Sequence, residues 1–292
     1  MKESCSEFHD INGLRQHVRL WGNPQAPKLF LLHGWMDVSA SFQFLVDALQ
    51  GDWHVIAPDW RGFGLSEWNR GSYYFPDYLA DLNALLDLYT PDEPADLVGH
   101  SMGGNIAGLY AGVRPYRVRT LVCVEGFGLE DSRPEEAPAR YEQWLDELAQ
   151  PQGFRPYTSF NGVEKRLTDN NSRMSREQAE FLARHWARQT EEGEVMLNFD
   201  HRHKMVNPVL YRLEEALACW SEVTAPTLWV VGSEYDFQKK FHETPEAFDR
   251  RKAAFRDFSE VRIEDAGHMI HHDQPRELAR AVEAFLRVKG GL

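Results

Sequence analysis

Short, nearly continuous apolar runs alternate with longer segments in which apolar residues recur every three or four positions. The continuous runs are typical of strands covered on both faces, and the recurring pattern is typical of helices with one buried face. Strands and helices in alternation predict right-handed crossovers and a mainly parallel sheet, so the expected fold class is α/β. Strands are expected at 28–32, 52–57, 95–98, 120–124 and 227–231, and helices at 42–49, 76–89, 102–113 and 275–288.

This alternation stops in the middle of the chain. Strand-like runs disappear, and helical patterns rich in Arg, Glu, Trp and Tyr cover 141–149, 175–189 and 208–220. Ser175 followed by Gln178 three positions later resembles a capping box at the start of the second pattern. We therefore expect a core domain formed by residues 1–129 and 218–292, with residues 130–217 inserted as a helical cap (lid).

Composition excludes several classes of function. The 292 residues contain 32 Lys and Arg against 45 Asp and Glu, a formal net charge of −13, which disfavours nucleic acid and anionic membrane surfaces as partners. No apolar run approaches the ~20 residues of a membrane span, and the first residues lack the apolar stretch of a secretory signal. Cys5, Cys123 and Cys219 are too scattered for a disulfide framework or a thiolate metal site. We expect a soluble, cytoplasmic protein; the sequence does not indicate its oligomeric state.

The strongest chemical signal is Ser101 within Gly99-His100-Ser101-Met102-Gly103, a G-x-S-x-G motif. It directly follows an apolar strand and directly precedes a helix, which is the context this motif requires. A strand that turns at once into a helix holds the middle side chain clear of the sheet edge, and the flanking glycines avoid clashes in the tight turn. We therefore predict Ser101 as a nucleophile at the N-terminus of a helix.

A serine nucleophile needs a base. His268 follows the strand-like run 261–263 and Gly267, just before the last helix, where an imidazole can reach the edge of the sheet. We predict His268 as the base; its neighbours His271 and His272 are alternatives.

A third residue must orient the imidazole and stabilise its protonated form. Asp236 comes soon after the strand 227–231, and Glu125 ends the strand that precedes the cap. The chain order Ser, Asp, His favours Asp236 as the acid, with Glu125 and then Glu234 as alternatives.

Acyl transfer also needs hydrogen-bond donors for an oxyanion. We expect one from the backbone N–H of Met102, directly after the nucleophile. We expect the second from the backbone N–H of Trp35, because Gly34 lets the loop after strand 28–32 approach the serine.

Together these segments resemble the α/β-hydrolase family, in its capped, serine hydrolase and esterase-like branch. The resemblance implies a mostly parallel, eight-stranded sheet with helices on both faces and a helical cap after the sixth strand, which fits residues 130–217. Relatives that are dehalogenases or epoxide hydrolases use an aspartate nucleophile, so Ser101 argues against both activities. The matching segments are HGWMD at 33–37, DWRGFGLS at 59–66, GHSMGG at 99–104, the acid near Asp236, and GHMIHHDQP at 267–275.

Two further patterns carry less weight. The glycine-rich segment 59–66 lacks the spacing of a phosphate-binding loop, so we interpret it as a structural loop beside the site. His201 and His203 could suggest metal ligands, but Asp200, Arg202 and Lys204 around them favour a solvated polar turn. We expect no cofactor and no metal.

The residues therefore predict a serine hydrolase that cleaves carboxylic esters of small to medium acyl groups through an acyl-enzyme. A lactone, thioester or carbon–carbon bond hydrolase with the same triad is the first alternative. A non-catalytic ligand-binding protein on a hydrolase fold is the alternative from another class.

Overall fold

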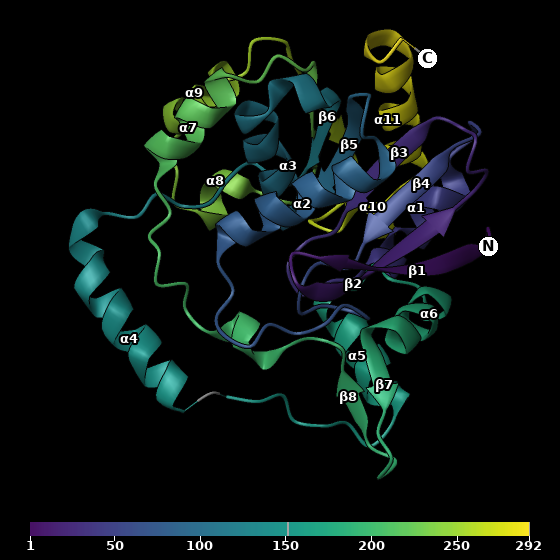
Figure 1. The fold of residues 1–292 in the computed structure, drawn as a ribbon, viewed down its shortest axis with the longest axis vertical. Helices are drawn as coiled ribbons and strands as arrows, with labels where there is room; N and C mark the ends of the chain where they lie inside the picture. The colour runs from purple at the N-terminus through teal and green to yellow at the C-terminus, as the bar shows by residue number, and fades with distance from the viewer. Residues whose placement is uncertain (151, 292) are drawn as a thin grey trace.

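The computed structural model describes residues 1–150 and 152–291, and an eight-stranded sheet lies at its centre (Figure 1). The strand order is β1-β2-β4-β3-β5-β6-β9-β10. The pairs β1/β2 and β2/β4 are antiparallel, and all later pairs are parallel. The predicted α/β class is confirmed. The strands are β1 (Ser4–Ile11), β2 (Leu14–Trp21), β3 (Lys28–Leu32), β4 (His54–Pro58), β5 (Ala95–His100), β6 (Val118–Val124), β9 (Thr227–Gly232) and β10 (Phe258–Ile263).

The apolar runs in the sequence do not predict the hairpin β1–β2, which the structure contains. β1 lies at the edge of the sheet and most of its residues are at least partly exposed, so it carries no continuous apolar run. Its turn is nevertheless encoded locally, because Asn12 (φ 51°) and Gly13 (φ 76°) both adopt the positive φ of a two-residue hairpin turn.

Helices cover both faces of the sheet. One face packs against α2 (Phe75–Tyr89), α3 (Met102–Val113) and α7 (Leu213–Ser221), and the other against α1 (Gln43–Ala48), α10 (Ile270–Asp273) and α11 (Pro275–Lys289). Alternate residues of β6 serve the two faces: Leu121 and Cys123 join the first core, and Val122 and Val124 the second. This burial on both faces explains the continuous apolar runs of the central strands.

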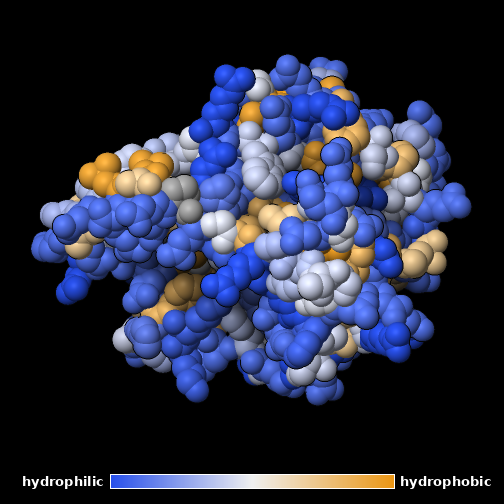
Figure 2. Space-filling model, turned by 90° about the horizontal axis from the view of Figure 1, so that it is seen from below, coloured by the Kyte–Doolittle hydropathy of each residue, from blue (hydrophilic) through white to orange (hydrophobic). Residues whose placement is uncertain are grey.

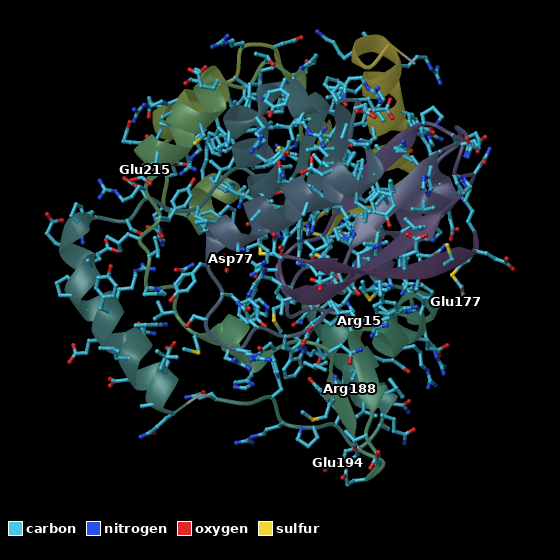
Figure 3. The ribbon with its side chains drawn as sticks, in the orientation of Figure 1. Arg15, Asp77, Glu177, Arg188, Glu194 and Glu215 are labelled. Atoms are coloured by element: carbon cyan, nitrogen blue, oxygen red, sulfur yellow. The ribbon has the colours of Figure 1, made fainter. Side chains whose placement is uncertain are left out.

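The chain leaves the sheet after β6 and returns at β9. Between them lie α4 (Ala137–Ala149), α5 (Phe160–Asn170), α6 (Arg176–Trp186) and the strands β7 (Ala187–Gln189) and β8 (Val195–Leu197), with α7 before the return. Ser175 and Gln178 form the predicted capping box at α6, with bonds of 3.1 and 2.8 Å. The helix expected to reach residue 189 instead ends at Trp186, and Figure 3 shows Arg188 and Glu194 on the hairpin that follows.

Helix α4 lies apart from the sheet, at the left of Figure 1. Its inner side is held by polar bonds, from Trp144 Nε1 to Ser72 Oγ (3.1 Å) and from the Val206 N–H to Glu147 (2.6 Å). Figure 2 shows hydrophobic residues on the surface of the lobe at its left, and Leu145 and Leu148 of α4 are exposed. No helix among the described residues is long and apolar enough to cross a membrane.

After β9 the chain forms α8 (Phe237–Lys240) and α9 (Pro245–Ala253) before β10. The loops at the carboxyl ends of β3, β5, β6, β9 and β10 meet at one edge of the sheet, because these strands are parallel. The predicted site residues lie on these loops or in the first turn of the helix that follows them.

Candidate active site

Ser101 occupies the sharp turn between β5 and α3. Its backbone has φ 51° and ψ −116°, a strained conformation for a non-glycine residue, and its N–H donates to the carbonyl of Val124 (2.8 Å). A side-chain carbon at Gly99 would overlap the backbone of Gly103, and one at Gly103 would overlap the backbone of Leu32. The two glycines thus allow the turn that presents the serine.

The structure brings Ser101 and His268 into hydrogen-bond contact. His268 Nε2 lies 3.1 Å from Ser101 Oγ, and the imidazole side chain is 29% exposed. Burial, then the neighbouring His100 ring and Lys240, lowers the pKa of His268 well below its ordinary value. The imidazole is therefore neutral at pH 7 and free to accept the serine proton.

Glu125, directly after β6, approaches the same imidazole from the other side. Its Oε2 lies 3.9 Å from His268 Nδ1, and its Oε1 accepts the N–H of Gly232 at 2.5 Å. Burial raises the pKa of Glu125 to about 8, because little nearby charge offsets the loss of hydration. The carboxyl group is held at the end of β9 in a position to orient the imidazole.

Asp236 does not reach this position. It is exposed and caps α8, where its Oδ1 accepts the N–H of Lys239 at 2.9 Å. No hydrogen bond or ion pair joins it to His268 in the part of the chain that the structure describes. Glu234 is also exposed and pairs with Arg173. The strand end that faces the imidazole is that of β6 instead of β9, so the two acids expected after β9 turn outward.

The two alternative bases also lie elsewhere. His271 and His272 are buried within α10, at 0% and 3% exposure, and neither ring nitrogen of either residue has a hydrogen-bond partner among the described residues. His271 Nε2 lies 3.6 Å from Asp37 Oδ2. Neither histidine is in contact with Ser101 Oγ, whose described partner is His268.

The loop after β3 passes close to the serine at Gly34. A side-chain carbon there would lie 3.2 Å from Ser101 Cβ and 2.9 Å from His100 Nδ1. The next residue, Trp35, and the first residue of α3, Met102, have backbone N–H groups with no acceptor among the described residues. Two unused donors thus lie on the segments that flank Ser101.

A cavity of about 370 Å³ opens over Ser101 and His268. Residues of the inserted segment between 202 and 207 contribute to its lining. Polar side chains within it include Asn105, Arg202 and Lys240. Most of the remaining lining is apolar or aromatic: Trp35, Phe75, Tyr78, Leu129, Met205, Phe237 and Phe241.

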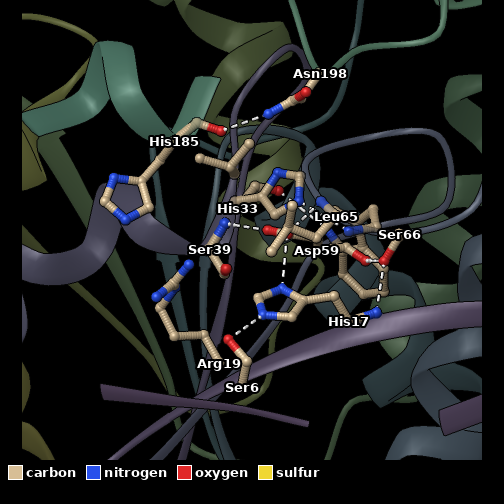
Figure 4. A network of polar contacts seen from close by, with 12 residues as sticks. Ser6, His17, Arg19, His33, Ser39, Asp59, Leu65, Ser66, His185 and Asn198 are labelled. Carbon is tan, nitrogen blue, oxygen red and sulfur yellow. Dashed lines mark hydrogen bonds and ion pairs between the residues drawn. The ribbon is translucent and has the colours of Figure 1, made fainter. Parts of the chain in front are cut away.

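Asp59 organises the loops beside this cavity (Figure 4). Its carboxylate accepts from His17 Nδ1 (2.8 Å) and from the N–H groups of Ser39 (2.6 Å) and Leu65 (2.9 Å). Burial alone would raise the pKa of Asp59, but the hydrogen bond and charge of His17 hold it well below its ordinary value. The ionised carboxylate thus links β2, the loop after β3 and the loop 59–66.

His203 is not part of a solvated turn, in contrast to our expectation. It is buried between the rings of Phe63 and Tyr73, with ring centroids 3.8 and 3.7 Å away, and its Nε2 contacts the carbonyl of Arg61. Aromatic packing therefore explains this histidine, whereas His201 remains partly exposed beside Asp200.

The family model of the alpha/beta hydrolase fold matches residues 27–275, so the chain belongs to this family. It is 26% identical to a serine hydrolase-like protein of Danio rerio over 98% of this chain and 90% of the relative. It is also 26% identical to a 3-hydroxybutyrate-oligomer hydrolase of Cupriavidus necator, over 91% of this chain and 90% of the relative.

A solved structure with a similar fold is the thioesterase domain from the curacin biosynthetic pathway. It has a TM-score of 0.85 and 25% identity, and the alignment covers 97% of this chain and 99% of that domain. The family and these relatives support a hydrolase whose substrate is a small molecule.

Proposed function

We propose that this chain is a serine hydrolase that cleaves carboxylic esters through Ser101, His268 and Glu125. The observation that carries the proposal is the 3.1 Å contact between His268 Nε2 and the Oγ of a serine held in a strained turn. Nucleophile and base in hydrogen-bond contact, with an acid behind the base, constitute the arrangement that acyl transfer needs.

In the first step, Ser101 Oγ attacks the acyl carbonyl carbon while His268 Nε2 takes the serine proton. The N–H groups of Trp35 and Met102 stabilise the oxyanion, and Glu125 stabilises the imidazolium when its carboxyl group is ionised. The tetrahedral intermediate collapses as His268 gives the proton to the leaving alcohol, which leaves an acyl-enzyme. Water, activated by His268, then attacks the acyl-enzyme and releases the acid and free Ser101.

We further propose that residues 130–217 act as a cap on a core formed by residues 1–129 and 218–292. Support comes from the cavity lining, in which residues between 202 and 207 of this segment occur together with Ser101 and His268. The cavity of about 370 Å³ fits small to medium acyl groups.

Thioesters are a second candidate substrate class, with the same triad. The favouring observation is the fold match to a thioesterase domain over 97% of this chain. The 3-hydroxybutyrate-oligomer hydrolase among the relatives favours oxygen esters instead.

Labelling with a fluorophosphonate probe, read by intact mass, tests the mechanism. We expect one adduct on the wild type and none on Ser101→Ala, with ester turnover lost in the same variant. A panel of p-nitrophenyl esters and matched thioesters of increasing acyl length then ranks the substrate classes. Folded wild-type protein that neither labels nor turns over any member would favour the non-catalytic, ligand-binding alternative.

A further inference from the structure

Three buried side chains converge behind the nucleophile, outside the substrate cavity. They are Asp37, His100 and His271, with 1%, 2% and 0% of their surface exposed. One ligand-type atom of each, a carboxylate oxygen or a ring nitrogen, lies within 4.8 Å of the other two. The residues come from the loop after β3, the end of β5 and α10, so only the fold brings them together.

Asp37 presents one satisfied and one unsatisfied oxygen. Oδ1 accepts the N–H of Val38 (2.9 Å), the hydroxyl of Ser41 and Nε1 of Trp186 (3.2 Å). Oδ2 has no hydrogen-bond partner within residues 1–150 and 152–291, and it lies 3.6 Å from His271 Nε2. The three donors on Oδ1 fix the carboxylate with Oδ2 facing the histidines.

His100 has its tautomer fixed by a neighbour. Its Nε2 lies 2.9 Å from the carbonyl oxygen of His268, an acceptor, so Nε2 carries the proton and Nδ1 carries a lone pair. In the part of the chain that the structure describes, this Nδ1 has no hydrogen-bond partner, and neither does either ring nitrogen of His271. Asp37 Oδ2 and His100 Nδ1 are therefore two buried hydrogen-bond acceptors beside the imidazole of His271. A neutral imidazole can supply only one N–H to them.

Without a cation, this cluster destabilises the fold. Its buried acceptor atoms have lost their hydrogen bonds to water, and no protein donor among the described residues replaces them. The nearby His33 does not supply the missing hydrogen-bond donor. His33 Nδ1 bonds the carbonyl of Gly34, and its Nε2 accepts the N–H of Trp60.

We propose that Asp37 Oδ2, His100 Nδ1 and His271 Nε2 bind one divalent first-row transition-metal ion, such as Zn²⁺. Two imidazoles and a carboxylate are ligands that these ions favour. Bonds of about 2.0–2.2 Å to a tetrahedral ion separate the ligand atoms by about 3.4 Å. The 3.6 Å between Asp37 Oδ2 and His271 Nε2 is already close to this value.

The ion would connect the segments that carry the proposed catalytic groups. Asp37 lies two residues after Trp35, His100 directly precedes Ser101, and His271 lies three residues after His268. The ion would lie behind the turn that carries Ser101, where it has no access to the substrate. Its expected effect is therefore to fix these loops and to raise the stability of the fold. The binding site does not depend on the proposed function, because its ligands include none of the proposed catalytic residues.

Refolding the full chain with one equivalent of Zn²⁺ or Co²⁺, after chelation and unfolding, tests the proposal despite the burial of the site. We expect one ion per chain by elemental analysis, a visible Co²⁺ absorption typical of low coordination number, and a Tm raised by several degrees. Asp37→Asn keeps an oxygen for the three donors, and His271→Gln keeps the volume. Both are expected to weaken binding at least ~10-fold, because each removes a charged or imidazole ligand.

His272→Gln, in the same helix, and His201→Gln, on the surface, are the matched controls and should bind as the wild type does. The proposal is overturned if the refolded wild type retains no ion, or if Asp37→Asn and His271→Gln bind as tightly as the controls. It is equally overturned if His201→Gln alone abolishes binding, since that result locates the ion at the surface. Each outcome is independent of ester turnover.

Discussion

Glu125 Oε2 and His268 Nδ1 face each other at 3.9 Å, and neither atom has a hydrogen-bond partner among the described residues. The separation is too long for a hydrogen bond in the resting enzyme. A positive charge on the imidazole would attract the carboxylate and shorten the distance between these two atoms. An acid that orients the imidazole must make this contact during catalysis. The proposed triad therefore uses an acid from the strand adjacent to that of the nucleophile.

The first prediction separates the two acids. Above pH 8, where the Glu125 carboxyl group is ionised, Glu125→Gln should lower kcat by ~10²–10⁴-fold, because it removes the charge that stabilises the imidazolium. Asp236→Asn should keep most of the turnover, since an asparagine can still cap α8. Steady-state kinetics on the best p-nitrophenyl ester measure both effects. A large loss in Asp236→Asn with little loss in Glu125→Gln would contradict the assignment.

The second prediction concerns stability. Glu125 has an ordinary pKa of 4.5 when unfolded and about 8 when folded. Between these values the folded state retains the proton that the unfolded state releases, so the free energy of unfolding falls as pH rises from about 4.5 to 8.

Glu125→Gln should remove this contribution. The variant is expected to gain a few kcal/mol relative to the wild type between pH 4 and pH 9. Urea unfolding of both proteins at the two pH values measures the gain. Parallel pH dependence of wild type and variant would show that Glu125 is not buried as a neutral acid.

The contact between Ser101 and His268, the proposed nucleophile and base, could be anticipated because the signals of both residues are local. Ser101 sits in a motif whose strand and helix are visible in the sequence, and His268 follows a strand and a glycine. The acid could not be settled in this way. Both β6 and β9 end beside the site, and the side chain that turns inward is decided by packing, which buries Glu125 and leaves Asp236 exposed.

Other features depend on contacts between distant segments. The cluster of Asp37, His100 and His271 is invisible along the chain, because its members belong to a loop, a strand end and a helix that are distant in sequence. The hairpin β7–β8 has strands of three residues, too short for any periodicity to indicate. Sequence reasoning found the parallel core because its strands are buried on both faces.

The third prediction tests the oxyanion donors. In Gly34→Ala the added carbon would lie 2.9 Å from His100 Nδ1 and 3.2 Å from Ser101 Cβ, so the loop must shift away from the serine. The shift displaces the Trp35 N–H and should lower kcat by ~10–100-fold. Gly71→Ala is the control, because an added carbon there meets no atom within 4 Å, and it should retain activity. Equal activity of the two variants would argue against a donor at Trp35.

The fourth prediction addresses Asp59, whose carboxylate is ionised because the hydrogen bond and charge of His17 outweigh burial and lower its pKa from 3.8. A lowered folded pKa contributes stability that is present above pH 3.8 and is lost as the pH falls further. Asp59→Asn should destabilise the fold by about 3 kcal/mol at pH 7, because an amide nitrogen would face the donors of Ser39, Leu65 or His17. The difference should shrink at pH 3, where the wild type loses part of this stabilisation, and urea unfolding at the two pH values measures it.

Asp52→Asn, at an exposed residue before β4, is the matched control and should leave stability unchanged. If Asp59→Asn unfolded at the same urea concentration as this control, the Asp59 network would not stabilise the loops around the site.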